Sequence, residues 1–377
     1  MLRLFALASL LLITLSQSNV RASPCLSFDV DFNLYAFGFN GKDWNAGTQD
    51  VWATATNATD ITTAGRPPFD GENTTCYLAQ YFNAIYVLNG DAKNPSSVYI
   101  YDAGSKSWSK QATTPGSFDY SSFDTILDHD TNVFYALSKG AMYSLNMDTL
   151  KVARSGAIPW NLVQKPDLLQ NYNPVMALAQ NHIHFLNVGN DGPGKARIFV
   201  IHYSYLQPEV QSYTGEKVFP AAYGQATSFF KQSGVQEEFA FIPDDFSGTY
   251  VINVENNSTR TLPPPRVKDT KSSYVAGITS LVQLDSIGAV SFLPYVPGDS
   301  SANANATWTS IKGLPVVALY KSGSSTSNNP HVNGTGVPGN TDTSHSSSGG
   351  VLRSAAISSA MTRAARTPQT AMGYTSS

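Results

Sequence analysis

The stretch Ala84-Ile85-Tyr86-Val87-Leu88 decides the fold, because five similar apolar strands accompany it along the chain at a spacing of about 50 residues. Repeats of this period indicate units that cannot bury their apolar faces alone and therefore stack on one another. The six strands are 33–37, 84–88, 133–137, 182–186, 238–242 and 289–293.

Further apolar strands flank these six. About ten residues earlier lie 26–30, 77–80, 123–127, 175–179, 226–230 and 276–284, and third strands follow at 98–101, 141–145, 198–201 and 249–252. Each unit is therefore predicted to be a meander of three or four antiparallel strands. Radial stacking leaves only short edges, so the sequence predicts an all-β, six-bladed β-propeller over residues 23–320. A strand at 316–320 is expected to complete an existing sheet and close the ring.

The amino-terminal segment is typical of a secretory signal peptide. Arg3 precedes an apolar run over residues 4–15, and Val20-Arg21-Ala22 places suitable residues before a cleavage point. The run is too short to span a bilayer, so no transmembrane segment is predicted. We expect residues 1–22 to be removed and the mature chain to begin near Ser23, in an oxidising compartment.

The two mature cysteines occupy equivalent positions in the first two units. Cys25 and Cys76 each lie ten residues before the middle of their repeat's central strand. In an oxidising compartment this arrangement predicts a disulfide between neighbouring blades, the alternative being two separate buried thiols.

Composition supports a secreted glycoprotein. The net charge is −3 and charged residues make up 14%, with no basic patch of the kind that binds nucleic acid. Residues 321–377 are rich in Ser, Gly and Thr and predict a disordered tail. Six N-glycosylation sequons begin at Asn57, Asn73, Asn256, Asn257, Asn305 and Asn333.

One unit resembles a kelch repeat. The strand Val98-Tyr99-Ile100-Tyr101-Asp102 is followed by Trp108, seven positions after Tyr101, and Asn89-Gly90 follows the preceding strand. The chain is similar to the secreted kelch-like, galactose-oxidase-central-domain-like propellers of fungi. The copper enzymes on that scaffold share a tyrosine–cysteine crosslink and a pair of copper-ligating histidines. No copper-site residue is carried over, because the only mature cysteines are the predicted disulfide pair.

Two histidines and one tryptophan are candidate binding residues. His182 and His184 alternate along a strand and so point to one face, a spacing that suits a metal, with His202 as a conceivable third ligand. Ordinary hydrogen-bonded histidines are the favoured interpretation, because no acidic or cysteine ligand completes the set. Trp44 lies outside the expected strands and could stack on a sugar or be buried under a capping loop.

The remaining acidic motifs predict turns. Residues 128–132 match the first half of a calcium loop, but Val133 and Lys139 stand where glycine and glutamate are needed. Asp244-Asp245 and Glu237-Glu238 are sequence neighbours, which cannot flank a glycosidic bond as catalytic carboxylates must. Acids from different blades could still meet in the central funnel.

No catalytic residue, metal or cofactor is therefore predicted. We expect a non-catalytic binding or scaffold protein, secreted or associated with the cell wall, whose partner is a glycan or an extracellular protein. The alternative is a glycan-active or oxidative enzyme with a site in the central funnel of the propeller.

Overall fold

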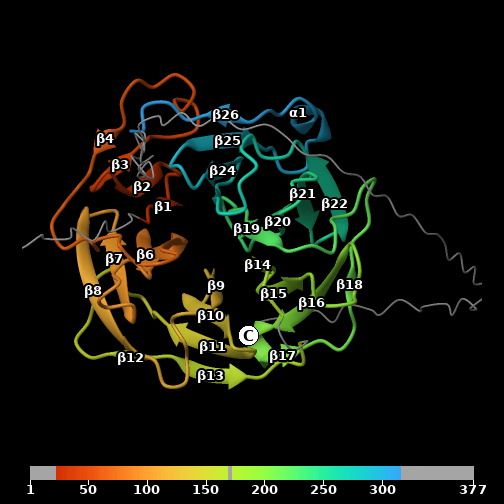
Figure 1. Ribbon diagram of the computed structural model, residues 1–377, viewed down its shortest axis with the longest axis horizontal. Coiled ribbons are helices and arrows are strands. Elements are labelled where there is room, and N and C mark those ends of the chain that lie inside the picture. Colours follow the sequence, from red (N-terminus) through yellow and green to blue (C-terminus); the bar gives the residue numbers. More distant parts are fainter. Residues whose placement is uncertain (1–22, 169–171, 316–377) are drawn as a thin grey trace, which may run out of the picture. The chain divides into compact units, whose positions relative to one another are not determined.

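The computed structural model describes residues 23–168 and 172–315, which form six mainly antiparallel sheets arranged in a ring (Figure 1). The predicted six-bladed β-propeller is confirmed. The innermost strands of successive blades are neighbours all the way round, including the first and the sixth. The expected signal peptide, the expected tail and the strand at 316–320 lie outside the described residues.

Each blade is built mainly from consecutive segments of the chain, which run from the centre of the ring outwards. Blade 1 contains β1 (Cys25–Phe28), β2 (Leu34–Phe39), β3 (Lys42–Asn45) and β4 (Thr59–Asp60). Blade 2 contains β5 (Thr75–Ala79), β6 (Ala84–Leu88), β7 (Ser97–Asp102), β8 (Ser107–Thr114) and a parallel addition, β12 (Ile158–Pro159). Blade 3 contains β9 (Asp124–Asp128), β10 (Val133–Ser138), β11 (Ala141–Asn146) and β13 (Asn161–Gln164).

The other three blades follow the same plan. Blade 4 contains β14 (Met176–Ala179), β15 (His182–Leu186), β16 (Lys195–Val200), β17 (Tyr205–Leu206) and β18 (Gln211–Ser212), the last two both pairing with β16. Blade 5 contains β19 (Gly224–Ser228), β20 (Glu238–Pro243), β21 (Thr249–Asn253) and β22 (Ser258–Leu262). Blade 6 contains β23 (Ser273–Ala276), β24 (Ser280–Leu284), β25 (Val290–Pro294) and β26 (Thr309–Ser310).

Helical structure in the described residues is confined to short segments. They are η1 (Gln80–Phe82), η2 (Ile201–Tyr203) and α1 (Ser300–Ala304). Within the described ranges, no helix has the length and apolar character that crossing a bilayer requires.

The predicted strand positions are wrong in the sixth repeat. In blades 1 to 5 the repeated apolar strand is the second of its blade, but 289–293 corresponds to β25, the third. The second strand is β24, and the stretch 276–284 holds the end of β23, a turn and β24. Both β24 and β25 are almost fully buried, so hydrophobicity alone does not distinguish them.

Aromatic side chains fill the space between blades 1 and 2. Trp108 on β8 contacts Tyr101 on β7, with ring centroids 4.9 Å apart, and Phe37 on β2 at 5.2 Å. Phe69, in the connection between the blades, stacks on Phe37 and is covered by the guanidinium of Arg66. Trp108 therefore packs one blade against the next.

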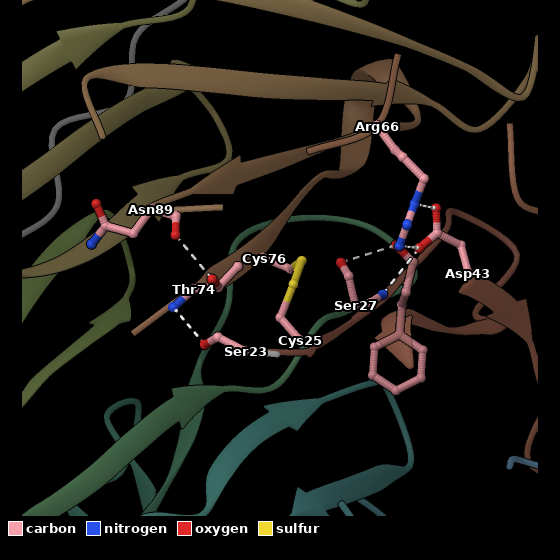
Figure 2. The surroundings of a disulfide bond; sticks show 10 residues. Ser23, Cys25, Ser27, Asp43, Arg66, Thr74, Cys76 and Asn89 are labelled. Carbon is pink, nitrogen blue, oxygen red and sulfur yellow. Dashed lines mark hydrogen bonds and ion pairs between the residues drawn. A yellow bond between two sulfur atoms is a disulfide. The ribbon is translucent and has the colours of Figure 1, made fainter. Parts of the chain in front are cut away.

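The predicted disulfide is confirmed. Cys25 on β1 and Cys76 on β5 are bonded, with Cα atoms 5.8 Å apart, and neither cysteine is free (Figure 2). Around it the Thr74 N–H donates to Ser23 Oγ, and the Thr74 hydroxyl donates to the Asn89 carbonyl. The bond therefore joins the innermost strands of adjacent blades.

The seam between blades 6 and 1 is closed by packing and loop hydrogen bonds. Trp52 lies against Phe292 of β25, with ring centroids 5.2 Å apart, and its carbonyl accepts the Lys312 N–H. Thr279 donates its hydroxyl to Gln49 Oε1 at 2.8 Å. Among the described residues, no blade combines strands from both ends of the chain.

Candidate functional site

The innermost strands of all six blades line a central cavity of about 2420 Å³. Ligand pockets for small molecules generally span about 300–1,000 Å³, so this cavity has room for a larger, extended ligand. It reaches past the beginnings of the inner strands into the loops that precede them, such as residues 70–74, 115–123 and 270–272. These loops form its open mouth.

Contacts between blades cross the ring at the ends of the inner strands, away from the mouth. Phe230, just after β19, lies against Phe32 of blade 1 and His129 of blade 3, with ring centroids 5.8 and 4.7 Å away. Gln80 of blade 2 donates its side-chain amide to the Lys231 carbonyl at 3.0 Å, which joins opposite blades. Burial lowers the pKa of His129 to about 4, so this end carries a neutral imidazole at pH 7.

Asp124, the first residue of β9, lies in the cavity wall. Its Oδ1 accepts the Thr125 N–H at 2.9 Å. Burial raises the pKa of this carboxyl to about 7, against the opposing effect of backbone N–H groups of Thr125 and Met176. Asp124 is therefore an acid that can hold or release a proton near neutral pH.

Three tyrosines from other blades lie within electrostatic reach of Asp124. The pKa values of Tyr77, Tyr172 and Tyr223 are raised mainly by burial, with a further contribution from the charge of Asp124. The side chains come from blade 2 and from the segments that enter blades 4 and 5, and all line the cavity. Tyr223 is 40% exposed, so part of its ring is free to meet a ligand.

The mouth is acidic. Six carboxylates line the cavity, at Asp70, Glu72, Asp91, Asp119, Asp124 and Asp285, whereas the lining includes two lysines, Lys139 and Lys271. Lys139 is paired with Asp119 at 2.6 Å. The cavity therefore has a negative field at pH 7.

The sequence-predicted binding residues lie elsewhere. Neither His182, His184 nor Trp44 lines the cavity. His184 is 4% exposed, its Nδ1 lies 2.9 Å from the Tyr213 hydroxyl, and burial lowers its pKa to about 3. His202 in η2 is exposed, unlike His184. His184 is thus a hydrogen-bonded core residue.

Trp44 corrects one expectation. It lies on β3, not outside the strands, and is partly buried against the core that blades 1 and 2 share. Its indole N–H donates to the Phe39 carbonyl at 3.3 Å, and Lys42 Nζ lies over its ring. The aromatic side chains that line the cavity instead include Tyr77, Tyr172 and the partly exposed Tyr223.

The acidic turns at residues 128–132 and 244–245 form as predicted, but the predicted turn at Glu237-Glu238 is wrong, because Glu238 is the first residue of strand β20. Residues 129–132 join β9 to β10, and Asp128 accepts hydrogen bonds from Thr131 Oγ1 and the Asp130 N–H. Asp244 and Asp245 lie in the turn between β20 and β21, and Glu238 of β20 accepts a hydrogen bond from the Tyr295 hydroxyl.

Within residues 23–168 and 172–315, no cluster of three His, Cys, Asp or Glu side chains could hold a metal ion.

The sequons in the described ranges are accessible. Asn57, Asn73, Asn256, Asn257 and Asn305 are all exposed, and Asn333 lies outside the described residues. Asn73 belongs to the mouth of the cavity.

Sequence reasoning did not find Asp124, Tyr223 or Asp285. The available signal was a charged residue at the start of an apolar inner strand, as Asp124 is in β9. Because the inner strands of a propeller face the channel, a polar residue there is a candidate for the cavity wall.

No family model matches the chain, and no curated protein matches it. Among solved structures, the chain is similar to one described as the structure of YjhT, with 10% sequence identity and a TM-score of 0.47. The similarity covers 77% of this chain and 97% of that one. At this level it assigns no function to this chain.

Proposed function

We propose that the protein is a secreted, non-catalytic, kelch-like propeller that binds a glycan in its central cavity, at a cell surface or in a cell wall. The observation that carries the proposal is a large central cavity with a partly exposed tyrosine among many hydrogen-bonding side chains. Sugars present apolar ring faces and rims of hydroxyls, which suit such a lining. The exposed sequons and the disulfide are compatible with secretion.

Tyr223 provides the test of this proposal. We expect Tyr223→Ala to weaken binding of a cell-wall oligosaccharide about tenfold, equivalent to about 1.4 kcal/mol. Isothermal titration calorimetry with the full chain measures the affinity. Tyr203→Ala is the matched control, because Tyr203 is 83% exposed and does not line the cavity. Equal losses for both variants, or no binding by the unaltered protein, would contradict the proposal.

Asp124 favours a second candidate, a glycan-active enzyme that uses the same cavity. A carboxyl whose pKa is raised to about 7 suits a general acid. Steady release of reducing sugar from a wall polysaccharide, abolished by Asp124→Asn, would replace the binding-module proposal with this one. An oxidative enzyme has no corresponding observation in its favour.

A further inference from the structure

We infer that the cavity selects a cationic amino sugar, such as an oligomer of hexosamine with free amino groups, over neutral or acidic glycans. This inference rests on the proposed function and names the ligand class for the same cavity.

The first step is the balance of charge. One of the two lysines, Lys139, already pairs with Asp119, so its charge is not available to an anionic ligand. The other, Lys271, lies near Asp269. Burial works to raise the pKa of the Asp269 carboxyl, but hydrogen bonds from Ser286 and Lys271, together with the charge of Lys271, lower this pKa overall. An acidic glycan entering the mouth would therefore meet uncompensated carboxylates, whereas an ammonium group would be attracted.

The second step is an unpartnered buried oxygen. Asp285 is 3% exposed and forms part of the cavity wall. Its Oδ1 accepts the N–H groups of Ile287 at 3.1 Å and Ala289 at 2.7 Å. Its Oδ2 is buried and has no hydrogen-bond partner among the described residues. A buried carboxylate oxygen without a donor is unfavourable, and a ligand's N–H would satisfy it once binding moves the side chains that cover the oxygen.

The third step concerns the shape of the ligand. Hydrogen bonds from neighbouring segments hold the mouth carboxylates in place: Asp70 accepts the Ala92 N–H at 2.8 Å, and Asp91 accepts the hydroxyl of Tyr99 on β7 at 2.7 Å. Carboxylates held around the mouth, with a tyrosine ring on another part of the cavity wall, suit an extended sugar that bears ammonium groups, because a ring face can stack on the tyrosine while the cations pair with the carboxylates. A flexible cationic peptide would lack the sugar ring that Tyr223 is placed to meet.

The test compares four hexamers by isothermal titration calorimetry with the full chain. They are β-1,4-linked glucosamine, β-1,4-linked N-acetylglucosamine, galacturonic acid and lysine. We expect the glucosamine hexamer to bind at least tenfold more tightly than the others, with weaker binding at higher ionic strength. Equal or tighter binding of the lysine hexamer would contradict an amino-sugar site.

Asp285→Asn is expected to weaken glucosamine-hexamer binding about tenfold. Asp245→Asn is the matched control, because Asp245 Oδ1 also accepts a turn N–H, from Ser247, but Asp245 is exposed and outside the cavity. Circular dichroism checks that both variants fold. If Asp285→Asn does not fold, Glu72→Gln at the exposed mouth replaces it and is expected to weaken the same binding at low ionic strength. An unchanged affinity in the folded variant would overturn the inference.

The outcomes separate the two proposals. Binding of the neutral hexamer with at least equal affinity, still lost in Tyr223→Ala, would overturn the amino-sugar inference and leave the glycan-binding function standing. Failure of all three sugar hexamers to bind would overturn both.

Discussion

Asp124 holds a carboxyl where its charge is poorly solvated. Its folded pKa is about 7, above its ordinary value of 3.8, and the cause is burial. Between these two values the folded protein binds a proton that the unfolded chain releases. The contribution of Asp124 to stability is therefore fully present below about pH 4 and is lost as the pH rises through about 7.

Asp124→Asn tests this linkage. The amide keeps an oxygen for the Thr125 N–H but cannot ionise. We expect the variant to be more stable than the unaltered protein at pH 8 by about 2 kcal/mol, a value that allows for solvation of the carboxyl in the cavity. We expect this advantage to be lost by pH 4. Chemical denaturation at both pH values measures it. Asp50→Asn, an exposed carboxyl outside the cavity, is the control; an equal change at both pH values would argue against a raised pKa.

At the scale of elements, the disulfide joins β1 to β5 across an interface already filled by strand packing. It closes a loop whose ends are 51 residues apart in sequence. A cross-link that closes a loop of this length restricts the unfolded chain more than the folded one. In the chain-entropy account this raises the free energy of unfolding by about 4 kcal/mol.

The double variant Cys25→Ala/Cys76→Ala is expected to fold with its β-sheet circular dichroism signal retained. It should unfold at lower denaturant concentration, because its free energy of unfolding is lower by about 3–4 kcal/mol. Equilibrium unfolding followed by circular dichroism measures the loss. Reduction of the unaltered protein should reproduce most of it. A double variant as stable as the oxidised protein would show that the bond adds nothing to blade packing.

Strand order could be predicted from sequence in five blades and not in the sixth. In blades 1 to 5 the repeated apolar segment is the second strand, and these strands begin at intervals of about 49 to 56 residues. Blade 6 departs from this period, because β24 begins at Ser280, about 42 residues after the start of β20 at Glu238. Its second and third strands are equally apolar, and the regular period selected the third.

At the scale of the whole molecule, the ring explains why the candidate site left no linear signature. Asp124, Tyr223 and Asp285 come from blade 3, from the entry to blade 5 and from blade 6. They share one cavity because the inner strands converge on it. Sequence spacing identified the strands that make the wall, but which side chains meet across the cavity depends on the completed ring.

Hydrogen–deuterium exchange of the full chain, with and without glucosamine hexamer, tests the claim that the central cavity is the binding site. We predict slower exchange in segments 70–78, 118–127, 172–178 and 223–228, which line the mouth and wall. Outer strands such as β4 and β22, and the segment 80–82, which does not line the cavity, should be unchanged. Slower exchange confined to outer strands, or none under saturating ligand, would contradict the account.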